Sequence, residues 1–292
     1  MEPVRIFSTI TETRAECRTV WTNGKRLGLV PTMGALHEGH LSLVRAAKAQ
    51  CDVVAVSLFV NPTQFGPTED LAKYPRPFER DRELLEKEGV AILFAPSAEE
   101  MYPKGEVTRV VVEALSEKLD GRSRPGHFRG VTTVVSKLFH IIEPNVAFFG
   151  QKDAAQSAII RRMVRDLNFP VEIVICPIVR EPDGLAMSSR HTYLNPEERQ
   201  RALVLCHSLK VVEETFRAGE KRAAPLIAAA RDFFTHEPRV RLDYFEIVDP
   251  DTLDPVEHIA QPALIAVAAY VGPTRLIDNV ILTPGKVEPS IS

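Results

Sequence analysis

Residues 29–43 read LVPTMGALHEGHLSL. The segment begins in an apolar run typical of a buried strand, is broken by Pro31 and Gly34, and continues with apolar residues at helical spacing. A strand, a tight turn and a helix in this order place backbone N–H groups and the positive end of a helix dipole beyond the sheet edge, which suits a phosphate. His37 and His40 share one face at the start of this helix and can donate hydrogen bonds to a bound phosphate.

The segment resembles the signature of the HxGH nucleotidylyltransferase superfamily, which reads His37-Glu38-Gly39-His40 here. The longer string PTMGALHEGH, residues 31–40, is more specific and resembles the pantothenate synthetase (pantoate–β-alanine ligase) family. The resemblance implies an ATP- and Mg²⁺-dependent enzyme in which the pantoate carboxylate attacks the α-phosphorus of ATP. Pyrophosphate leaves, and the amine of β-alanine then displaces AMP from the pantoyl adenylate to give pantothenate.

Composition and charge exclude several other classes of protein. The 292 residues are 45% hydrophobic and 26% charged, which is ordinary for a globular protein, and the net charge of −3 provides no general basic field for a nucleic acid. The four cysteines are scattered without a CxxC pair, and the first residues show no signal-peptide pattern. The apolar runs are too short for a membrane span. We therefore expect a cytoplasmic protein that acts on small molecules, and the resemblance implies a homodimer.

Strand and helix patterns alternate from residue 26 to about residue 176, which predicts an α/β fold with a doubly wound, Rossmann-like parallel sheet. After residue 183 the pattern changes to amphipathic helices over 196–218 and 223–234, followed by two or three strands. We therefore expect two domains: residues 1–183 would bind ATP and pantoate, and residues 184–292 would form a smaller α+β lid.

Three further segments carry structural expectations. Residues 108–112 form a β-branched run typical of a strand, whereas residues 61–77, with four prolines, and residues 119–130, rich in Gly, Arg and Pro, are expected to be loops. Long loops in compact domains tend to be functional. The tail from Pro284 is expected to be mobile.

The two histidines also have simpler interpretations. An isolated pair with this spacing is more often a pair of surface or capping residues, and a zinc site would need a third ligand and usually the HExxH spacing. The strand–turn–helix context and the longer string favour function. The resemblance implies that His37 and His40 contact ATP phosphates, that His37 donates a proton, and that Met33, Gly34 and Gly39 also lie at ATP. Gly39 has no side chain and would let a nucleotide approach closely.

A second polar element is Met187-Ser188-Ser189-Arg190. Its two hydroxyls and its guanidinium suit phosphate oxygens, although a polar linker between domains is the simpler interpretation of the segment alone. It resembles the KMSKS loop of the same superfamily, and it differs from that loop because its cationic residue comes last. The resemblance implies that these four residues and Val179 bind ATP and that Arg190 is catalytic. At a domain boundary, such a loop could close over ATP.

A third element, Gly150-Gln151-Lys152-Asp153, follows a predicted strand at the sheet edge where ligands bind in such folds. Lys152 would meet a phosphate as a point charge, and Asp153 could simply cap the next helix. The resemblance adds catalysis by Lys152 and ATP contacts for Gly150, Lys152 and Asp153.

The resemblance also implies a pantoate pocket. Gln64 and Gln156 would bind the acid through neutral amides that leave its carboxylate nucleophilic, with Pro31, Thr32 and Met33 as another wall. Arg124, in a basic cluster, would close on a phosphate of the bound substrates, and Asp81 would help to hold Mg²⁺. In each case the simpler interpretation is a solvated polar side chain.

Two other functions remain open. A nucleotidylyltransferase would move AMP or CMP onto a phosphate-bearing acceptor, and a basic acceptor pocket would favour it over the paired glutamines. A nucleotide-binding sensor would bind ATP without turning over any acid. Changing His40 to Ala would separate them, because an enzyme would lose turnover by orders of magnitude and a sensor would lose affinity alone.

Overall fold

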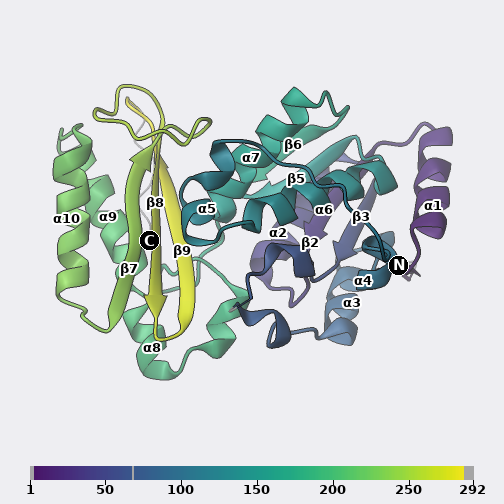
Figure 1. Ribbon diagram of the computed structural model, residues 1–292, viewed down its shortest axis with the longest axis horizontal. Helices are drawn as coiled ribbons and strands as arrows, with labels where there is room; N and C mark the ends of the chain where they lie inside the picture. Colours follow the sequence, from purple (N-terminus) through teal and green to yellow (C-terminus); the bar gives the residue numbers. More distant parts are fainter. Residues whose placement is uncertain (1–2, 68, 286–292) are drawn as a thin grey trace. The chain divides into compact units, whose positions relative to one another are not determined.

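The computed structural model describes residues 3–67 and 69–285, which form two compact units (Figure 1). The first unit comprises Met1–Glu117, Arg124–Gly150 and Ile159–Pro177. The second comprises Lys118–Ser123, Gln151–Ala158 and Ile178–Ser292. Two short segments of the second unit, Lys118–Ser123 and Gln151–Ala158, therefore interrupt the first unit along the sequence. The division into two domains at residue 183 stays a prediction.

The first unit contains a six-stranded parallel sheet with the order β1-β4-β3-β2-β5-β6. Its central strands are apolar and buried on both faces, as expected for a parallel sheet between helices. The strands are β1 (Arg5–Phe7), β2 (Leu27–Thr32), β3 (Val53–Leu58), β4 (Ile92–Phe94), β5 (Val146–Gly150) and β6 (Glu172–Cys176).

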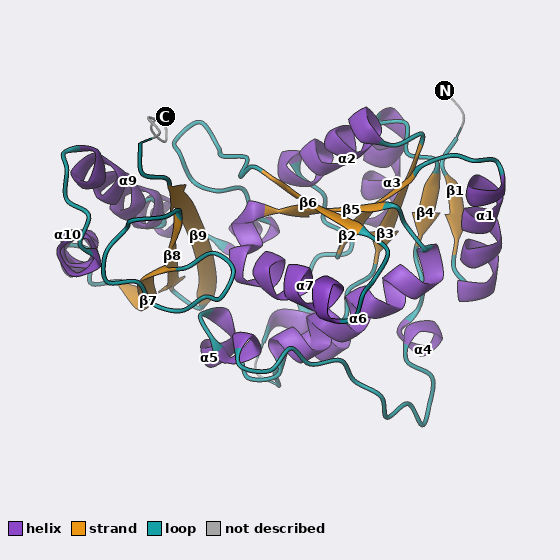
Figure 2. Cartoon of the chain, turned by 90° about the horizontal axis from the view of Figure 1, so that it is seen from above, coloured by secondary structure: helices purple, strands orange, loops and turns teal. Residues whose placement is uncertain are grey.

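Helices cover both faces of this sheet, with α2 and α3 on one side and α6 on the other (Figure 2). Their bounds are α1 (Ile10–Thr22), α2 (Glu38–Gln50), α3 (Phe78–Lys87), α4 (Ala98–Met101), α6 (His127–Ile142) and α7 (Ala154–Asp166). Short 3₁₀ turns are η1 (Pro62–Gln64), η2 (Asp70–Ala72) and η3 (Leu115–Glu117). The predicted α/β fold with a doubly wound parallel sheet is confirmed.

Strand order locates the point at which ligands bind in such sheets. From β2 the chain proceeds to β3 and β4 on one side, whereas β5 and β6 lie on the other side of β2. The order therefore reverses between β2 and β5, and the crevice outside the carboxyl ends of such a strand pair is the usual ligand site. The HxGH helix follows β2, and the Gly150 element follows β5.

The second unit contains a separate antiparallel sheet of β7 (Val240–Val248), β8 (Ala263–Val271) and β9 (Thr274–Leu282). Helices α9 and α10 contact it and bury a second core between themselves and the strands. The other elements are α5 (Asp120–Ser123), η4 (Gln151–Asp153), η5 (Ser189–Tyr193), α8 (Pro196–Arg201), α9 (Val204–Arg217) and α10 (Ala223–Thr235).

The predicted strand over residues 108–112 is wrong. Val110 donates its N–H to Thr133 and accepts a hydrogen bond from Thr132, so α6 side chains take the place of a strand partner. Val111 is 51% exposed, which shows that this β-branched run does not enter a core. Periodicity alone does not reveal such pairing with side chains.

Two other expectations about elements are also corrected. Residues 119–130 are helical in part, because α5 lies within them and α6 begins at His127 after Gly126 with φ of +83°. The helix expected over 196–218 is split into α8 and α9. The five consecutive residues 202–206 are all buried, and one straight helix cannot turn them all to the same face. The expected mobile tail falls largely on residues 286–292, outside the described residues.

Candidate active site

The turn after β2 places the start of α2. Gly34 has φ of +82° and Ala35 has φ of +52°, so the chain reverses in a conformation that glycine adopts without strain. Thr32 supports the turn, because its Oγ1 accepts from the N–H of Gly34 and donates to the carbonyl of Ser57 in β3. The predicted residues Pro31 and Thr32 thus end β2, with Thr32 tied to its neighbour strand.

Asp81 holds the same turn from α3. Its two carboxylate oxygens accept the N–H groups of Ala35 and Leu36 at 2.7 and 2.8 Å, and the residue is 1% exposed. Burial raises the pKa of this carboxyl, and the two backbone hydrogen bonds oppose that effect. The geometry gives Asp81 a structural role in positioning the HxGH segment. Its role as a Mg²⁺ ligand stays a prediction from the resemblance.

His37 and His40 lie together at the start of α2. Their ring centroids are 4.1 Å apart. His37 caps the helix, since its Nδ1 accepts from the N–H of Gly39, and Nδ1 of His40 accepts from the N–H of His37. An imidazole nitrogen that accepts a hydrogen bond carries no proton, so the neutral ring has its proton on Nε2. Both rings therefore present an Nε2–H donor beside a helix N-terminus.

The predicted pantoate-binding residue Gln64 lies beside Met33. Gln64 is 8% exposed, and its Nε2 donates to the sulfur of Met33 at 3.1 Å. Its Oε1 accepts from Nδ2 of Asn61 at 3.0 Å. The structure thus brings Gln64 to the end of the β2 segment that the sequence predicts as the opposite wall.

Asn61 is a site residue that sequence reasoning did not select. It is 1% exposed, and its Nδ2 donates to both Gln64 and the carbonyl of Gly130. Its Oδ1 accepts from Thr63 and from the hydroxyl of Tyr102. The signal was present in the sequence, because Asn61-Pro62 is a favoured turn start directly after an apolar strand.

Arg124 forms a bidentate ion pair with Glu69, at 2.8 and 2.7 Å. A third guanidinium nitrogen lies 3.0 Å from Nε2 of His127, whose Nδ1 lies 2.8 Å from the carbonyl oxygen of Gln64. Arg124 thus connects the loop after η1 to the start of α6. The contact observed for the predicted phosphate-binding arginine is a carboxylate of its own unit.

In the second unit, Lys152 lies in η4, which contacts β9. Burial lowers the pKa of Lys152; Asp153 opposes this shift, and Arg190 adds to it. Gln156 lies in the first turn of α7, directly after this 3₁₀ turn.

The segment Met187–Arg190 follows a short hairpin. Arg180 and Ala186 form an isolated antiparallel bridge, and Met187 donates its N–H to the carbonyl of the predicted ATP-binding residue Val179 at 3.0 Å. Ser188 caps η5, because its hydroxyl accepts from the N–H of Arg190. The hairpin therefore fixes the backbone that carries both serines and the guanidinium.

The predicted site residues fall into two sets. The first unit holds the histidines, Gln64 and Gly150 near the carboxyl ends of its strands, and the second holds Lys152, Gln156 and the Met187–Arg190 segment. In the described part of the chain, no group of three His, Cys, Asp or Glu side chains is arranged to hold a metal ion. No helix there is both long and apolar enough to cross a membrane.

Comparisons with known proteins agree with this architecture. The family model described as pantoate-beta-alanine ligase matches residues 5–281. A protein from Koribacter versatilis named pantothenate synthetase is 61% identical over 279 residues, which are 96% of either chain. A crystal structure of pantothenate synthetase from Thermus thermophilus matches with a TM-score of 0.90 and 48% identity, covering 95% of this chain and 99% of that one.

A third similar structure contains ligands. The pantoate-beta-alanine ligase from Francisella tularensis, complexed with beta-gamma ATP and beta-alanine, matches with a TM-score of 0.78 and 33% identity, covering 95% of this chain and 97% of that one. The fold and the paired histidines thus define an enzyme of the HxGH nucleotidylyltransferase superfamily. Within it, the chain belongs to the pantoate–β-alanine ligase family, as the sequence predicts.

Proposed function

We propose that this chain joins pantoate and β-alanine to form pantothenate, with ATP as co-substrate and pantoyl adenylate as the intermediate. The observation that carries the proposal is the pair of imidazoles, 4.1 Å apart, at a helix N-terminus after β2. A helix N-terminus with two Nε2–H donors suits the phosphates of ATP. The amide of Gln64 beside Met33 suits a small hydroxy acid.

The first step needs positioning and charge neutralisation more than a protein nucleophile. The pantoate carboxylate oxygen attacks the α-phosphorus, and the bond to the pyrophosphate oxygen breaks. His37 and His40 donate Nε2–H hydrogen bonds to phosphate oxygens as charge builds on them. Lys152, Ser188, Ser189 and Arg190 of the second unit supply the cations and hydroxyl groups that suit phosphate oxygens.

The remaining ATP and acid contacts follow the resemblance. Backbone and small residues would border the nucleotide: Met33, Gly34, Gly39, Gly150, Asp153, Val179 and Met187. Gln64 and Gln156 would bind pantoate against the wall of Pro31, Thr32 and Met33. In the second step the neutral β-alanine amine attacks the acyl carbonyl and gives up a proton, and the bond from that carbonyl carbon to the bridging oxygen breaks, so AMP leaves with an oxygen that came from the pantoate carboxylate. Arg124 would close on a phosphate of the bound substrates only after release from Glu69.

Mg²⁺ bound to ATP would neutralise phosphate charge. Mg²⁺ commonly binds substrate phosphates, waters and at most one or two carboxylates. The described residues include no group of three His, Cys, Asp or Glu side chains arranged around a metal, which fits an ion held mainly by ATP. A cytoplasmic location and a homodimer are further parts of the proposal. The four buried or half-buried free cysteines fit a reducing compartment.

Isotope exchange between labelled pyrophosphate and ATP tests the proposal. Exchange should require pantoate and Mg²⁺ but not β-alanine, because the adenylate forms before the amine enters. Exchange that is independent of pantoate would refute it. The His40→Ala variant should lose exchange by orders of magnitude while it stays folded and retains the two-unit fold. Retained turnover would remove His40 from the mechanism.

A further inference from the structure

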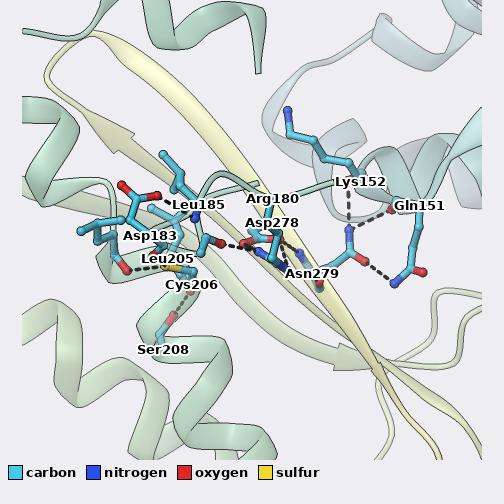
Figure 3. A network of polar contacts seen from close by, with 12 residues as sticks. Gln151, Lys152, Arg180, Asp183, Leu185, Leu205, Cys206, Ser208, Asp278 and Asn279 are labelled. Carbon is cyan, nitrogen blue, oxygen red and sulfur yellow. Dashed lines mark hydrogen bonds and ion pairs between the residues drawn. The ribbon is translucent and has the colours of Figure 1, made fainter. Parts of the chain in front are cut away.

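Asn279, in β9, makes three hydrogen bonds to the turn that carries Lys152. Its Nδ2 donates to the carbonyl oxygens of Gln151 and Lys152 at 3.0 and 2.9 Å, and its Oδ1 accepts from Nε2 of Gln151 at 3.2 Å (Figure 3). The two carbonyls belong to consecutive residues of η4. One side chain thus fixes the turn at two adjacent peptide groups.

Only an amide satisfies this arrangement. A primary amide places two N–H donors on one atom with an acceptor beside it, whereas the isosteric aspartate would present an oxygen to two carbonyl oxygens. Asn279 is 2% exposed, and a buried amide is costly unless its hydrogen bonds are made. A polar side chain at this position of an otherwise well-buried strand is therefore explained by the turn it contacts.

The preceding residue, Asp278, anchors the second phosphate-binding segment. Its carboxylate, 2% exposed, accepts from both terminal nitrogens of Arg180 at 2.7 and 3.0 Å. Arg180 also donates to the carbonyl of Gly184. It belongs to the hairpin that leads into Met187–Arg190, so the bidentate pair ties that hairpin to β9.

We infer, on the basis of the proposed function, that Asp278 and Asn279 are positioning residues for ATP activation. Asn279 fixes the backbone from which the Lys152 side chain extends, and in Figure 3 that side chain points away from the Asn279 contacts. Asp278 fixes, through Arg180, the hairpin before Met187–Arg190. Two neighbouring residues of one strand thus hold both phosphate-binding segments of the second unit in a common frame.

The expected effect is large because the chemistry depends on position. Lys152 has a flexible stem with four rotatable bonds, so its ammonium reaches one place reproducibly only if its backbone is fixed. A displacement of about 1 Å at a catalytic group can reduce a rate about 100-fold. Asn279→Ala should therefore reduce pantoate-dependent pyrophosphate exchange about 10- to 100-fold at saturating ATP. Asn279→Asp should reduce it at least as much, because it keeps the shape and reverses the polarity.

A double-mutant cycle separates positioning from a general structural effect. If Asn279 acts through Lys152, then Asn279→Ala should change exchange less than about threefold in a Lys152→Ala background. An equal fold-loss in both backgrounds would overturn the inference. Arg180→Lys, which keeps the charge and loses the bidentate geometry, is combined with Arg190→Ala in the same way. Additive losses there would overturn the part played by Asp278.

Thr274→Ala is the matched control, since Thr274 is a buried polar residue at the other end of β9. It should lower thermal stability without lowering exchange per folded molecule. If Asn279→Ala does not fold, Gln151→Ala removes one of the same bonds, and the cycle with Lys152→Ala is judged by the same threefold criterion. Additivity of Gln151→Ala and Lys152→Ala would overturn the inference as well.

Failure of the inference is distinguishable from failure of the proposed function. An unmodified protein without pantoate-dependent exchange would reject the function. Independently of activity, Asn279→Ala should speed amide hydrogen exchange in a peptide covering residues 151–157 relative to Thr274→Ala. Unchanged protection of that peptide would show that Asn279 does not hold the turn.

Discussion

The side-chain amide of Asn61 donates a hydrogen bond to Oε1 of Gln64 over 3.0 Å. This bond fixes which way the Gln64 amide points, because its oxygen faces a donor and its nitrogen faces Met33. Under the proposed function, Gln64 therefore presents N–H groups to pantoate, which suits the carboxylate and hydroxyl oxygens of that acid. Asn61 acts as a positioning residue for the pocket.

Asn61→Asp should weaken pantoate binding. The new carboxylate has no N–H to donate and faces Oε1 of Gln64, so the Gln64 amide must turn its nitrogen toward position 61. Its oxygen then meets the acid. We expect the KM for pantoate in pyrophosphate exchange to rise about tenfold or more, equivalent to at least about 1.4 kcal/mol, with the KM for ATP little changed.

Asn145→Asp is the matched control for that change. Asn145 also lies in the first unit, but it accepts from the N–H of Leu27 through Oδ1, and an aspartate keeps that acceptor. Its KM for pantoate should equal that of the unmodified protein. Equal KM values for Asn61→Asp and Asn145→Asp would show that Asn61 does not orient Gln64.

Gly130→Ala should destabilise the first unit. A Cβ at Gly130 would lie 2.4 Å from the carbonyl oxygen of Thr63 and 2.6 Å from Cα of Gln64, so backbone must move. Overpacking of this kind costs about 1–3 kcal/mol. Urea unfolding measures the cost as a lower midpoint at unchanged slope. The same displacement should raise the KM for pantoate, because Gln64 moves with η1.

Gly150→Ala provides the comparison for stability. A Cβ there meets nothing within 4 Å in the described part of the chain, and β5 ends at this residue. Its free energy of unfolding should lie within about 0.5 kcal/mol of that of the unmodified protein. If Gly130→Ala costs as little free energy as is expected for Gly150→Ala, helix α6 can withdraw from η1 at little cost.

Much of the first unit follows from local patterns. The buried runs of β2, β3 and β5, and the helices between them, are visible because a parallel sheet requires continuous apolar strands and amphipathic connections. The same reasoning gives the wrong prediction for residues 108–112, because the backbone of Val110 forms its hydrogen bonds with the side chains of Thr132 and Thr133. Those partners lie more than 20 residues away, beyond any local pattern.

The candidate site divides in the same way. His37 and His40 are found from sequence because a single turn carries them, and Asn61 could be found from its place at a strand end. The role of Asp81 requires the fold, because its partners Ala35 and Leu36 lie more than 40 residues before it. A buried aspartate on a charged helix otherwise resembles a solvated one.

Arg124→Met should change how stability depends on pH. Burial would raise the pKa of Glu69, but the hydrogen bond and charge of Arg124 outweigh it and hold that pKa below the usual 4.5. The folded state then binds fewer protons than the unfolded state, so the pair stabilises above pH 4.5, and this contribution is lost as pH falls through the lowered pKa. Both side chains are partly exposed, so the contribution is on the order of 1 kcal/mol.

The measurement is thermal unfolding between pH 7 and pH 3 for the two proteins. The Tm difference should be greatest near neutrality and should shrink below pH 4.5, where Glu69 becomes protonated. In the variant, burial still raises the pKa of Glu69 and is opposed only by the Gly66 backbone hydrogen bond and the His127 charge, so the stabilisation that ionised Glu69 contributes at neutral pH should be smaller. A Tm difference that is constant with pH would contradict an ionic origin.

Lys152→Arg should move the alkaline limit of adenylate formation. Burial lowers the pKa of Lys152 below the usual 10.5, so the ammonium loses its proton, and its attraction for phosphate, at a lower pH than an exposed lysine would. Activity that needs the cation is present below that pKa and is lost above it. An arginine stays charged throughout, so the alkaline fall in kcat/KM for ATP should shift to higher pH, although the different geometry lowers the maximal rate. The measurement is pyrophosphate exchange from pH 7 to pH 10.5, and Lys210→Arg in α9 is the control, for which we expect an unchanged pH profile. If the alkaline fall in kcat/KM for ATP occurs at the same pH in Lys152→Arg as in the unmodified protein, another group causes it, such as a metal-bound or substrate group. The charge of Lys152 would then not contribute to the rate-limiting interaction.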